Sequence, residues 1–181
     1  SHTCLVLLEA GHELVVVDNF INSSQEALTR VAALVGIAVG SKHLQVEKGD
    51  IRDQHCLDRI FKDAAVSDRP IDAVIHFAGL KAAGESVQKP LFYWDVNVAG
   101  SRTLLAAMQA NECRNLVFSS SATVYGFPEI VPIPESATIR PINPYGFSKA
   151  AVEQMLKDLV DSAPNTWRIA SLRYFNPVGA H

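Results

Sequence analysis

The chain has 181 residues, of which 48% are hydrophobic and 19% are charged, and its net charge at pH 7 is −3. This length fits one globular domain with a sizeable core. The mild acidity argues against nucleic-acid partners, and no apolar run reaches the roughly 18 residues that span a bilayer, so no membrane partner is expected. Three cysteines (Cys4, Cys56 and Cys113) without a Cys-x-x-Cys pair are typical of reduced thiols in the cytoplasm.

Short β-rich runs alternate with segments of helical period along the whole chain. In the first part, a helix is expected to stop at Gly11, Ser23-x-x-Glu26 has the form of a capping box, and Asp53 is a plausible helix cap. The expected helices are 3–10, 23–34, one following Asp53, 91–112 and 145–162. The expected strands are 14–17, 44–48, 73–77, 115–121 and 169–175, with a proline-rich loop over 127–144.

This order predicts an α/β fold with a doubly wound, Rossmann-like parallel sheet. The strands are almost continuously apolar, as expected when both faces of a sheet are covered. Because the chain opens with a helix, we expect the first strand of the fold to be missing from residues 1–181, which otherwise form a single domain.

Three predicted strands end in residues that suit a dinucleotide. The second strand of such folds ends in an acid that accepts hydrogen bonds from the adenosine ribose and disfavours a 2′-phosphate, and Asp18 holds that place. Gly49-Asp50-Ile51 and Phe77-Ala78-Gly79 follow two further strands. Each could be an ordinary turn, but the carboxyl ends of parallel strands share one edge of a sheet, so together they favour bound NAD.

A second pattern indicates alcohol oxidation. Tyr145 and Lys149 are four residues apart, so on a helix they share a face. A phenol is a weak base at neutral pH, and a nearby ammonium favours its ionised form. The spacing is common by chance, but Ser121 ends a strand nearby and Asn97 could hold a water or a backbone group behind the lysine. Together they predict hydride transfer between an alcohol and a nicotinamide ring.

These residues lie in four longer stretches: HFAGLKAAGESVQKP (76–90), FSSSATVYG (118–126), NPYGFSK (143–149) and LRYFNPVGAH (172–181). Through them the chain resembles the extended short-chain dehydrogenase/reductase family, and within it the branch of UDP-glucose 4-epimerases. The resemblance implies that the family's GGxGYIG loop would precede Ser1 and that a sugar-nucleotide-binding region would follow His181. Without these parts, we expect residues 1–181 alone to fold poorly, bind NAD weakly and show little activity.

The resemblance also implies roles for individual residues. Ser121, Tyr145 and Lys149 would be catalytic, with Tyr145 as the base; Ser121 and Tyr145 would touch the sugar of a UDP-sugar substrate and Asn176 its diphosphate. Helices 91–112 and 145–162 could pair in a homodimer. The implied NAD contacts are Asp18, Asn19, Phe20, Ile21, Asn22, Ser23, Asp50, Ile51, Phe77, Ala78, Gly79, Leu80, Lys81, Asn97, Ser121, Tyr145, Lys149 and Phe175.

Three alternatives compete with an epimerase. A nucleotide-sugar 4,6-dehydratase needs an additional acid and base, and the positions before Val-Tyr-Gly hold Ala122 and Thr123, which carry no carboxyl group. A non-catalytic NAD sensor would tend to lose the Tyr-Lys pair. A metal hydrolase is disfavoured because the six histidines lack ligand spacing, and His76 is expected to be a core histidine with satisfied hydrogen bonds. We therefore expect no metal site.

Overall fold

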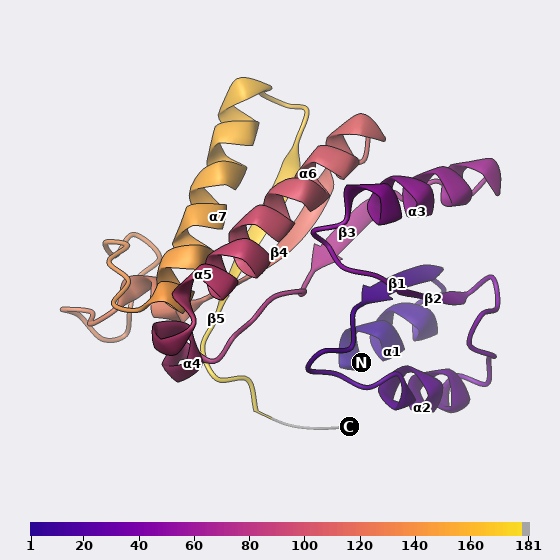
Figure 1. The fold of residues 1–181 in the computed structure, drawn as a ribbon, viewed down its shortest axis with the longest axis horizontal. Helices are drawn as coiled ribbons and strands as arrows, with labels where there is room; N and C mark the ends of the chain where they lie inside the picture. The colour runs from indigo at the N-terminus through magenta and orange to yellow at the C-terminus, as the bar shows by residue number, and fades with distance from the viewer. Residues whose placement is uncertain (179–181) are drawn as a thin grey trace. The chain divides into compact units, whose positions relative to one another are not determined.

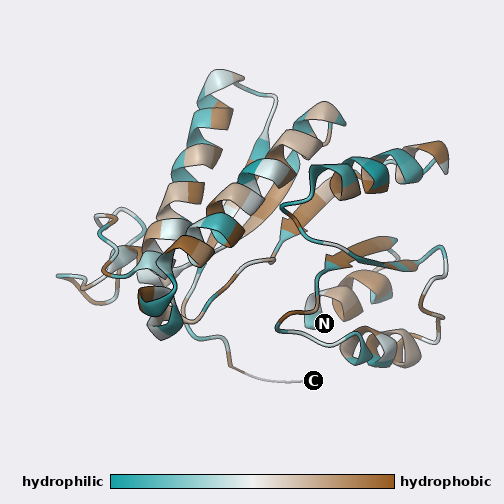
Figure 2. Ribbon diagram, in the orientation of Figure 1, coloured by the Kyte–Doolittle hydropathy of each residue, from teal (hydrophilic) through white to brown (hydrophobic). Residues whose placement is uncertain are grey.

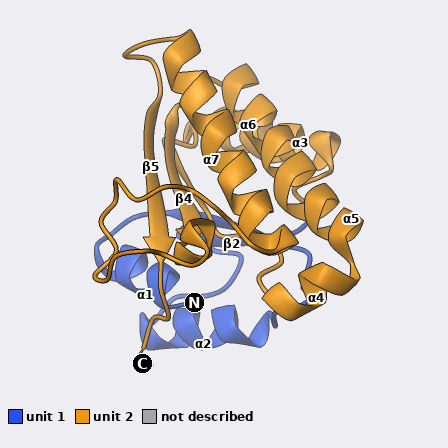
Figure 3. Ribbon diagram, turned by 90° about the vertical axis from the view of Figure 1, so that its left-hand side faces the viewer, with its two compact units in different colours: residues 1–50, 179–181 blue, residues 51–178 orange. Residues whose placement is uncertain are grey.

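The computed structural model describes residues 1–178, which form two compact units, residues 1–50 and 51–178 (Figure 1). Figure 3 colours the two units separately. In both units, neighbouring strands are parallel and are joined through helices. The predicted Rossmann-like α/β class is therefore confirmed.

The elements follow the predicted order. The helices are α1 (His2–Glu9), α2 (Glu26–Leu34), α3 (Gln54–Val66), α4 (Ala83–Gln88), α5 (Pro90–Tyr93), α6 (Gly100–Ala110) and α7 (Pro144–Ser162). Two further helical segments are the π-helix η1 (Trp94–Ala99) and the 3-10 helix η2 (Ala122–Tyr125). The strands are β1 (Leu14–Asp18), β2 (Leu44–Lys48), β3 (Ala73–His76), β4 (Asn115–Ser121) and β5 (Arg168–Tyr174).

The first unit contains a two-stranded sheet of β1 and β2, in which Leu14 pairs with Leu44 and Asp18 with Lys48. Helix α1 contacts both β1 and α2, and the buried residues of the unit include Leu5, Val31 and Leu44. As predicted, α1 ends just before Gly11, whose φ of 86° lies in the left-handed region that glycine adopts without strain.

The second unit contains a three-stranded sheet in the order β3-β4-β5, and α3, α6 and α7 cover one face of it (Figure 3). The core under these helices includes Leu57, Met108, Phe118 and Leu156. In Figure 2, hydrophobic colour predominates along β1 and β3, as the apolar runs of the sequence predict for these strands. Within the described residues, β3 pairs with β4 and with no other strand.

The structure corrects the expected single helix over 91–112. That segment consists of α5, η1 and α6, and an additional short helix, α4, precedes it. The π-helical turns in the middle leave no trace in the apolar periodicity, because their i→i+5 hydrogen bonds shift the helix face by only one residue. Strand ends shift by one residue as well: β3 stops at His76 and β5 covers 168–174.

The expected capping box at Ser23 is wrong. Helix α2 begins at Glu26, and its cap Gln25 makes no side-chain capping hydrogen bond. The Ser23 hydroxyl instead donates to Asp18 Oδ1 at 2.8 Å. The carboxylate at the end of β1 therefore binds the serine side chain in place of the helix N-terminus. Asp53, by contrast, caps α3 as predicted, since its side chain accepts a hydrogen bond from the Cys56 amide at 3.1 Å.

Residues 127–140 form a loop that closes on the segment just after β4. The Arg140 amide donates to the Val124 carbonyl at 2.9 Å, and this crossing brings the Arg140 carbonyl against Gly126. Gly126 has a φ of 62°, and a Cβ there would lie 2.1 Å from Arg140 O. The crossing of the two backbones therefore requires glycine at this position.

Gly126→Ala should lower the free energy of unfolding of the protein by at least about 2 kcal/mol, because the new Cβ adds a backbone clash to a left-handed conformation. Urea unfolding followed by circular dichroism measures the change. Gly84→Ala is the matched control: Gly84 lies in α4 with nothing within 4 Å of its Cβ position, so the substitution should be neutral or stabilising. Equal stability of the two variants would contradict the proposed backbone crossing.

Candidate active site

The carboxyl ends of β1 and β2 carry the first group of predicted site residues. Because the register pairs Asp18 with Lys48, the residues that follow the two strands lie side by side. The side-chain amide of Asn19 donates from Nδ2 to Asp50 Oδ2 at 3.2 Å, which links the two strand ends. The prediction that Asp18 and Asp50 share one edge of a parallel sheet is confirmed.

The turn after β1 is organised by the Asp18 carboxylate. Its Oδ1 accepts hydrogen bonds from the Phe20 amide and the Ser23 hydroxyl, both at 2.8 Å. Phe20 adopts a φ of 57°, which is unfavourable for an aromatic residue and is held by these bonds. Ile21, Asn22 and Ser23 are exposed. The turn thus places a half-buried carboxylate beneath an open surface.

In the second unit, the first turn of α7 carries the predicted catalytic pair. Asn143 caps the helix by accepting from the Gly146 amide at 2.9 Å, and Pro144 occupies the first helical position, where a missing N–H costs nothing. Tyr145 and Lys149 follow one turn apart. The local sequence Asn-Pro-Tyr-Gly therefore determines where the helix begins and which face the pair occupies.

Lys149 is 6% exposed, and its ammonium donates to the Ser119 carbonyl at 2.8 Å. It also lies 4.8 Å from the centroid of the Phe118 ring, a cation–π arrangement. Burial lowers the pKa of Lys149 to about 8. At pH 7 the side chain is therefore still mainly charged, but it loses its proton far more easily than an exposed lysine.

Asn97 connects the loop after β3 to α7. It is 3% exposed on η1, and its Oδ1 accepts from the Leu80 amide at 2.7 Å. Its amide nitrogen donates to the Leu80 carbonyl at 3.0 Å and to Ser148 Oγ at 2.9 Å. The Ser148 hydroxyl in turn donates to the Tyr145 carbonyl at 2.7 Å. Of the two roles that the sequence leaves open for Asn97, holding a water or holding a backbone group, these bonds show the second. π-helical turns often occur at functional sites.

Gly79 allows this loop to approach the pair closely. Its φ is 152°, and a Cβ there would lie 3.0 Å from Asn97 Oδ1 and 3.8 Å from Lys149 Nζ. The sequence analysis interprets Phe77-Ala78-Gly79 as a strand end that suits a dinucleotide. In the structure, the missing side chain at Gly79 leaves room for Asn97.

Ser121 ends β4 and is 9% exposed. Its hydroxyl is 2.9 Å from Thr123 Oγ1 and accepts from the Thr123 amide at 3.2 Å. Helix α7 reaches this turn because residue 146 is glycine: a Cβ at Gly146 would lie 3.0 Å from the Thr123 carbonyl oxygen. The serine turn and the first turn of α7 are therefore in direct contact, as the predicted chemistry requires.

Tyr93 is a site residue that the sequence analysis missed. It is fully buried, and its ring meets the half-buried Tyr145 ring edge-on, with centroids 6.5 Å apart and an interplanar angle of 80°. Its hydroxyl lies 2.8 Å from the Ala82 carbonyl oxygen and 3.0 Å from Glu85 Oε2, so these two acceptors share its one hydrogen. Burial, together with the Glu85 carboxylate, raises the pKa of Tyr93 to about 12. Tyr93 therefore stays neutral, packing beside Tyr145 without competing as a base.

Ser148 was missed as well, although it lies within the Tyr145–Lys149 motif. A serine one residue before the lysine gives no signal by itself, and only its complete burial between Asn97 and the Tyr145 carbonyl reveals its role. The other predicted residues of this unit differ in burial. Ile51 and Leu80 are buried and Ala78 is half-buried, whereas four are exposed: Phe77 (51%), Phe175 (64%), Lys81 and Asn176.

His76 is buried, and its Nε2 lies 2.8 Å from the Ser101 hydroxyl, so it is the hydrogen-bonded core histidine that the sequence predicts. Burial, and secondarily the charge of Lys149, lowers the pKa of His76 to about 3. Residues 1–178 contain no cluster of three or more potential metal-ligating side chains. None of the helices in that range is both long and apolar enough to cross a membrane.

Lys149→Met should raise the free energy of unfolding by roughly 2 kcal/mol at pH 7, since a pKa shift of one unit is worth about 1.4 kcal/mol and one hydrogen bond is lost. Below pH 8 the wild-type lysine is charged in both states, and the folded state bears the cost of burying it. Above pH 8 only the unfolded state stays protonated, so wild-type stability rises and the advantage of the variant shrinks. Urea unfolding between pH 6.5 and 9.5 tests this.

Lys157→Met is the control, because Lys157 is exposed on the same helix. Its effect on stability should be small and should not change over that pH range. If Lys149→Met also changed stability only slightly and independently of pH, the free-energy cost assigned to burying Lys149 would be contradicted.

Comparison with known proteins relates this geometry to a family. The chain matches the model of the NAD dependent epimerase/dehydratase family over residues 1–181. It is 52% identical to UDP-glucose 4-epimerase 1 of Oryza sativa subsp. japonica and 53% identical to UDP-glucose 4-epimerase of Yersinia enterocolitica. These matches cover 100% of the chain but 49% and 51% of the relatives, so the chain spans about half their length.

Solved structures agree with this result. UDP-glucose-4-epimerase from Stenotrophomonas maltophila, with bound NAD and formylated UDP-arabinopyranose, matches with a TM-score of 0.90 and 43% identity. UDP-glucose 4-epimerase from Bifidobacterium longum, in complex with NAD+ and UDP, matches with a TM-score of 0.90 and 45% identity. Each match covers 99% of this chain and 50% or 51% of the other. The chain belongs to the NAD-dependent epimerase/dehydratase family.

Proposed function

We propose that this chain carries the NAD-binding and catalytic part of a UDP-glucose 4-epimerase, with both units contributing to one NAD-binding domain. The observation that carries the proposal is the buried connection from Asn97 through Ser148 to the Tyr145 carbonyl, next to the buried Lys149 ammonium. Such a rigid base-and-ammonium pair beside a serine-bearing strand end suits oxidation of an alcohol. The names of the relatives supply the substrate class, a UDP-sugar.

The residues present fit NAD at the level of donor and acceptor chemistry. Asp18 offers a carboxylate at the end of β1 for ribose hydroxyls, and Asn19 and Asp50 offer polar groups beside it. In the other unit, the Lys149 ammonium has three hydrogens and gives one to Ser119, so it can donate further to a ribose. When bound, NAD would supply the hydride acceptor for oxidation at C4 of the sugar.

In the proposed reaction, Tyr145 removes the proton of the sugar 4-hydroxyl, and Ser121 donates a hydrogen bond to the same oxygen. The charged Lys149 lies one helical turn after Tyr145 on α7. The resulting 4-keto sugar would rotate within the site, and Tyr145 would return the proton to the 4-oxygen when the ketone is reduced from its other face. Tyr93 and Asn97 keep the site in place throughout, since both are bonded to the backbone of the loop after β3.

The local chemistry favours epimerisation over 4,6-dehydration. Dehydration requires a carboxyl acid and base, whereas the two residues that follow Ser121 are Ala122 and Thr123, and the Thr123 hydroxyl pairs with Ser121. The retained Tyr145–Lys149 pair also speaks against a purely NAD-sensing domain.

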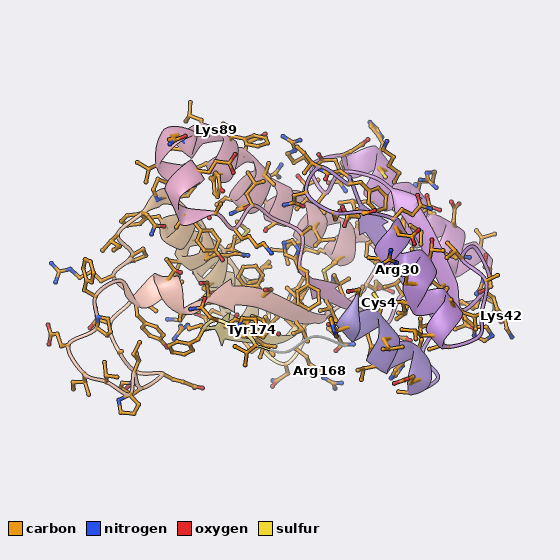
Figure 4. The ribbon with its side chains drawn as sticks, turned by 90° about the horizontal axis from the view of Figure 1, so that it is seen from below. Cys4, Arg30, Lys42, Lys89, Arg168 and Tyr174 are labelled. Carbon is orange, nitrogen blue, oxygen red and sulfur yellow. The ribbon has the colours of Figure 1, made fainter. Side chains whose placement is uncertain are left out.

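The remaining partners belong to the same proposal. Asn176 would approach the diphosphate of the UDP-sugar, and helices 91–112 and 145–162 would pair with those of a second copy in a homodimer. The three cysteines are free thiols, which fits the reducing cytoplasm predicted from the sequence; Cys4 is labelled in Figure 4.

The protein expressed from its complete gene should interconvert UDP-galactose and UDP-glucose without added NAD+, and Tyr145→Phe should lower kcat by at least about 100-fold while NAD stays bound. Coupled assay of UDP-glucose and the absorbance of the bound cofactor measure both. Tyr174→Phe removes a phenol hydroxyl from a half-exposed residue at the end of β5 (Figure 4) and should retain activity. Near-normal turnover by the Tyr145 variant would rule out its role as base.

Asp18→Asn should reduce the preference for NAD+ over NADP+ by about tenfold, because the amide keeps the hydrogen bonds of the turn but no longer repels a 2′-phosphate. Titration of the cofactor-free protein with each dinucleotide measures the two affinities. Glu9→Gln removes an exposed charge from the same unit and should leave the ratio unchanged. If both variants discriminate like the wild type, Asp18 does not face the ribose.

A further inference from the structure

A salt bridge between β5 and α7 connects several of the elements around the proposed site. Arg173 on β5 faces Glu153 on α7 with two parallel contacts: Nη2 to Oε2 at 2.7 Å and Nε to Oε1 at 3.0 Å. The two side chains are 26% and 12% exposed. A bidentate pair in this setting fixes both distance and orientation between helix and strand.

Both partners make additional hydrogen bonds. The Ser120 hydroxyl donates to Glu153 Oε1 at 2.5 Å, which ties β4 to the pair. Arg173 Nη1 donates to the Tyr125 hydroxyl at 2.7 Å and to the Glu135 carbonyl at 3.2 Å. The guanidinium carbon also lies 5.1 Å from the centroid of the Tyr125 ring. Hydrogen bonds to the Glu153 carboxylate and to the Tyr125 hydroxyl raise the pKa of Arg173, so its guanidinium stays charged.

The positions of these partners along the chain matter. Ser120 immediately precedes Ser121, and Glu153 lies one helical turn after Lys149. Tyr125 ends the 3-10 helix that Ser121 caps, and Glu135 lies in the loop 127–140. One guanidinium therefore connects the serine turn, the loop and the helix that carries the tyrosine–lysine pair.

We propose that Arg173 is a positioning residue: it sets the distance between Ser121 and Tyr145 and holds the loop 127–140 closed. This inference rests on the proposed function for its effect on turnover, but its effect on the loop is independent of it. A lysine cannot replace the arginine, because an ammonium cannot make the two parallel bonds to Glu153 and also reach the Tyr125 hydroxyl and the Glu135 carbonyl.

A role in stability alone would have different consequences. Loss of a buried ion pair lowers the melting temperature whether or not the pair affects catalysis. A positioning role additionally lowers kcat per folded molecule, because a displaced serine no longer matches the reacting oxygen, while the KM for the UDP-sugar changes little. It also frees the loop 127–140 for cleavage, since the Glu135 carbonyl loses its partner.

The test uses the protein expressed from its complete gene, with Arg173→Lys, Tyr125→Phe and the double variant. We expect kcat for UDP-galactose to fall about tenfold in Arg173→Lys and about threefold in Tyr125→Phe, with KM within twofold of the wild type. Because both substitutions remove the same contact, the double variant should lose no more than Arg173→Lys alone. Tyr125→Phe keeps the buried ring and so tests the contact even if Arg173→Lys fails to fold.

Cleavage by glutamyl endopeptidase after Glu135 is the second measurement, with an expected rate increase of about fivefold in Arg173→Lys. Arg168→Lys, at the other end of β5 (Figure 4), is the control and should match the wild type in both assays. Unchanged kcat together with unchanged cleavage would overturn the inference. If the wild type lacks epimerase activity, the proposed function fails, and the cleavage rate alone decides whether Arg173 holds the loop.

Discussion

The arrangement of the second unit depends on one side-chain amide, that of Asn97. Its oxygen accepts from the Leu80 N–H, and its nitrogen donates to the Leu80 carbonyl and to Ser148, so all its hydrogen-bonding groups have partners. Buried at 3% exposure, these bonds cannot be exchanged for bonds to water. They hold the loop after β3 against α7, and the π-helical segment is what brings residue 97 to that depth.

A charged group that is costly to bury, the Lys149 ammonium, lies close to this amide. The buried Lys149 ammonium has a carbonyl and an aromatic ring as neighbours, and burial lowers its pKa to about 8. That cost is tolerable because the surrounding core of α3, α6, α7 and β4 is large and apolar. An ammonium that is weakly solvated interacts strongly with any anionic group brought beside it, which is the property that a phenol base needs.

The site also requires that backbone segments approach one another closely, and glycine residues allow this. Gly79 lets the loop contact Asn97, Gly146 lets α7 contact the turn after Ser121, and Gly126 lets two backbones cross beside Tyr125. The sequence pointed to Gly79 and Gly146 only as members of motifs. Glycine is needed at these two positions because a Cβ would lie about 3 Å from atoms of residues far away in the chain. No local sequence pattern encodes such contacts.

The sequence by itself determined the α/β class, the strand ends with Asp18 and Asp50, and the pair Tyr145–Lys149, because periodicity and helix capping are local properties. It also identified Asn97 and the core histidine His76 from residue chemistry. Only the tertiary structure revealed the π-helical turn, the buried Tyr93 and Ser148, and the bridge between Arg173 and Glu153. The contacts of Ser148 with Asn97, of the Tyr93 ring with Tyr145 and of Arg173 with Glu153 join residues 20 or more positions apart. Burial and hydrogen-bond geometry across such separations are decided when helices pack on the sheet.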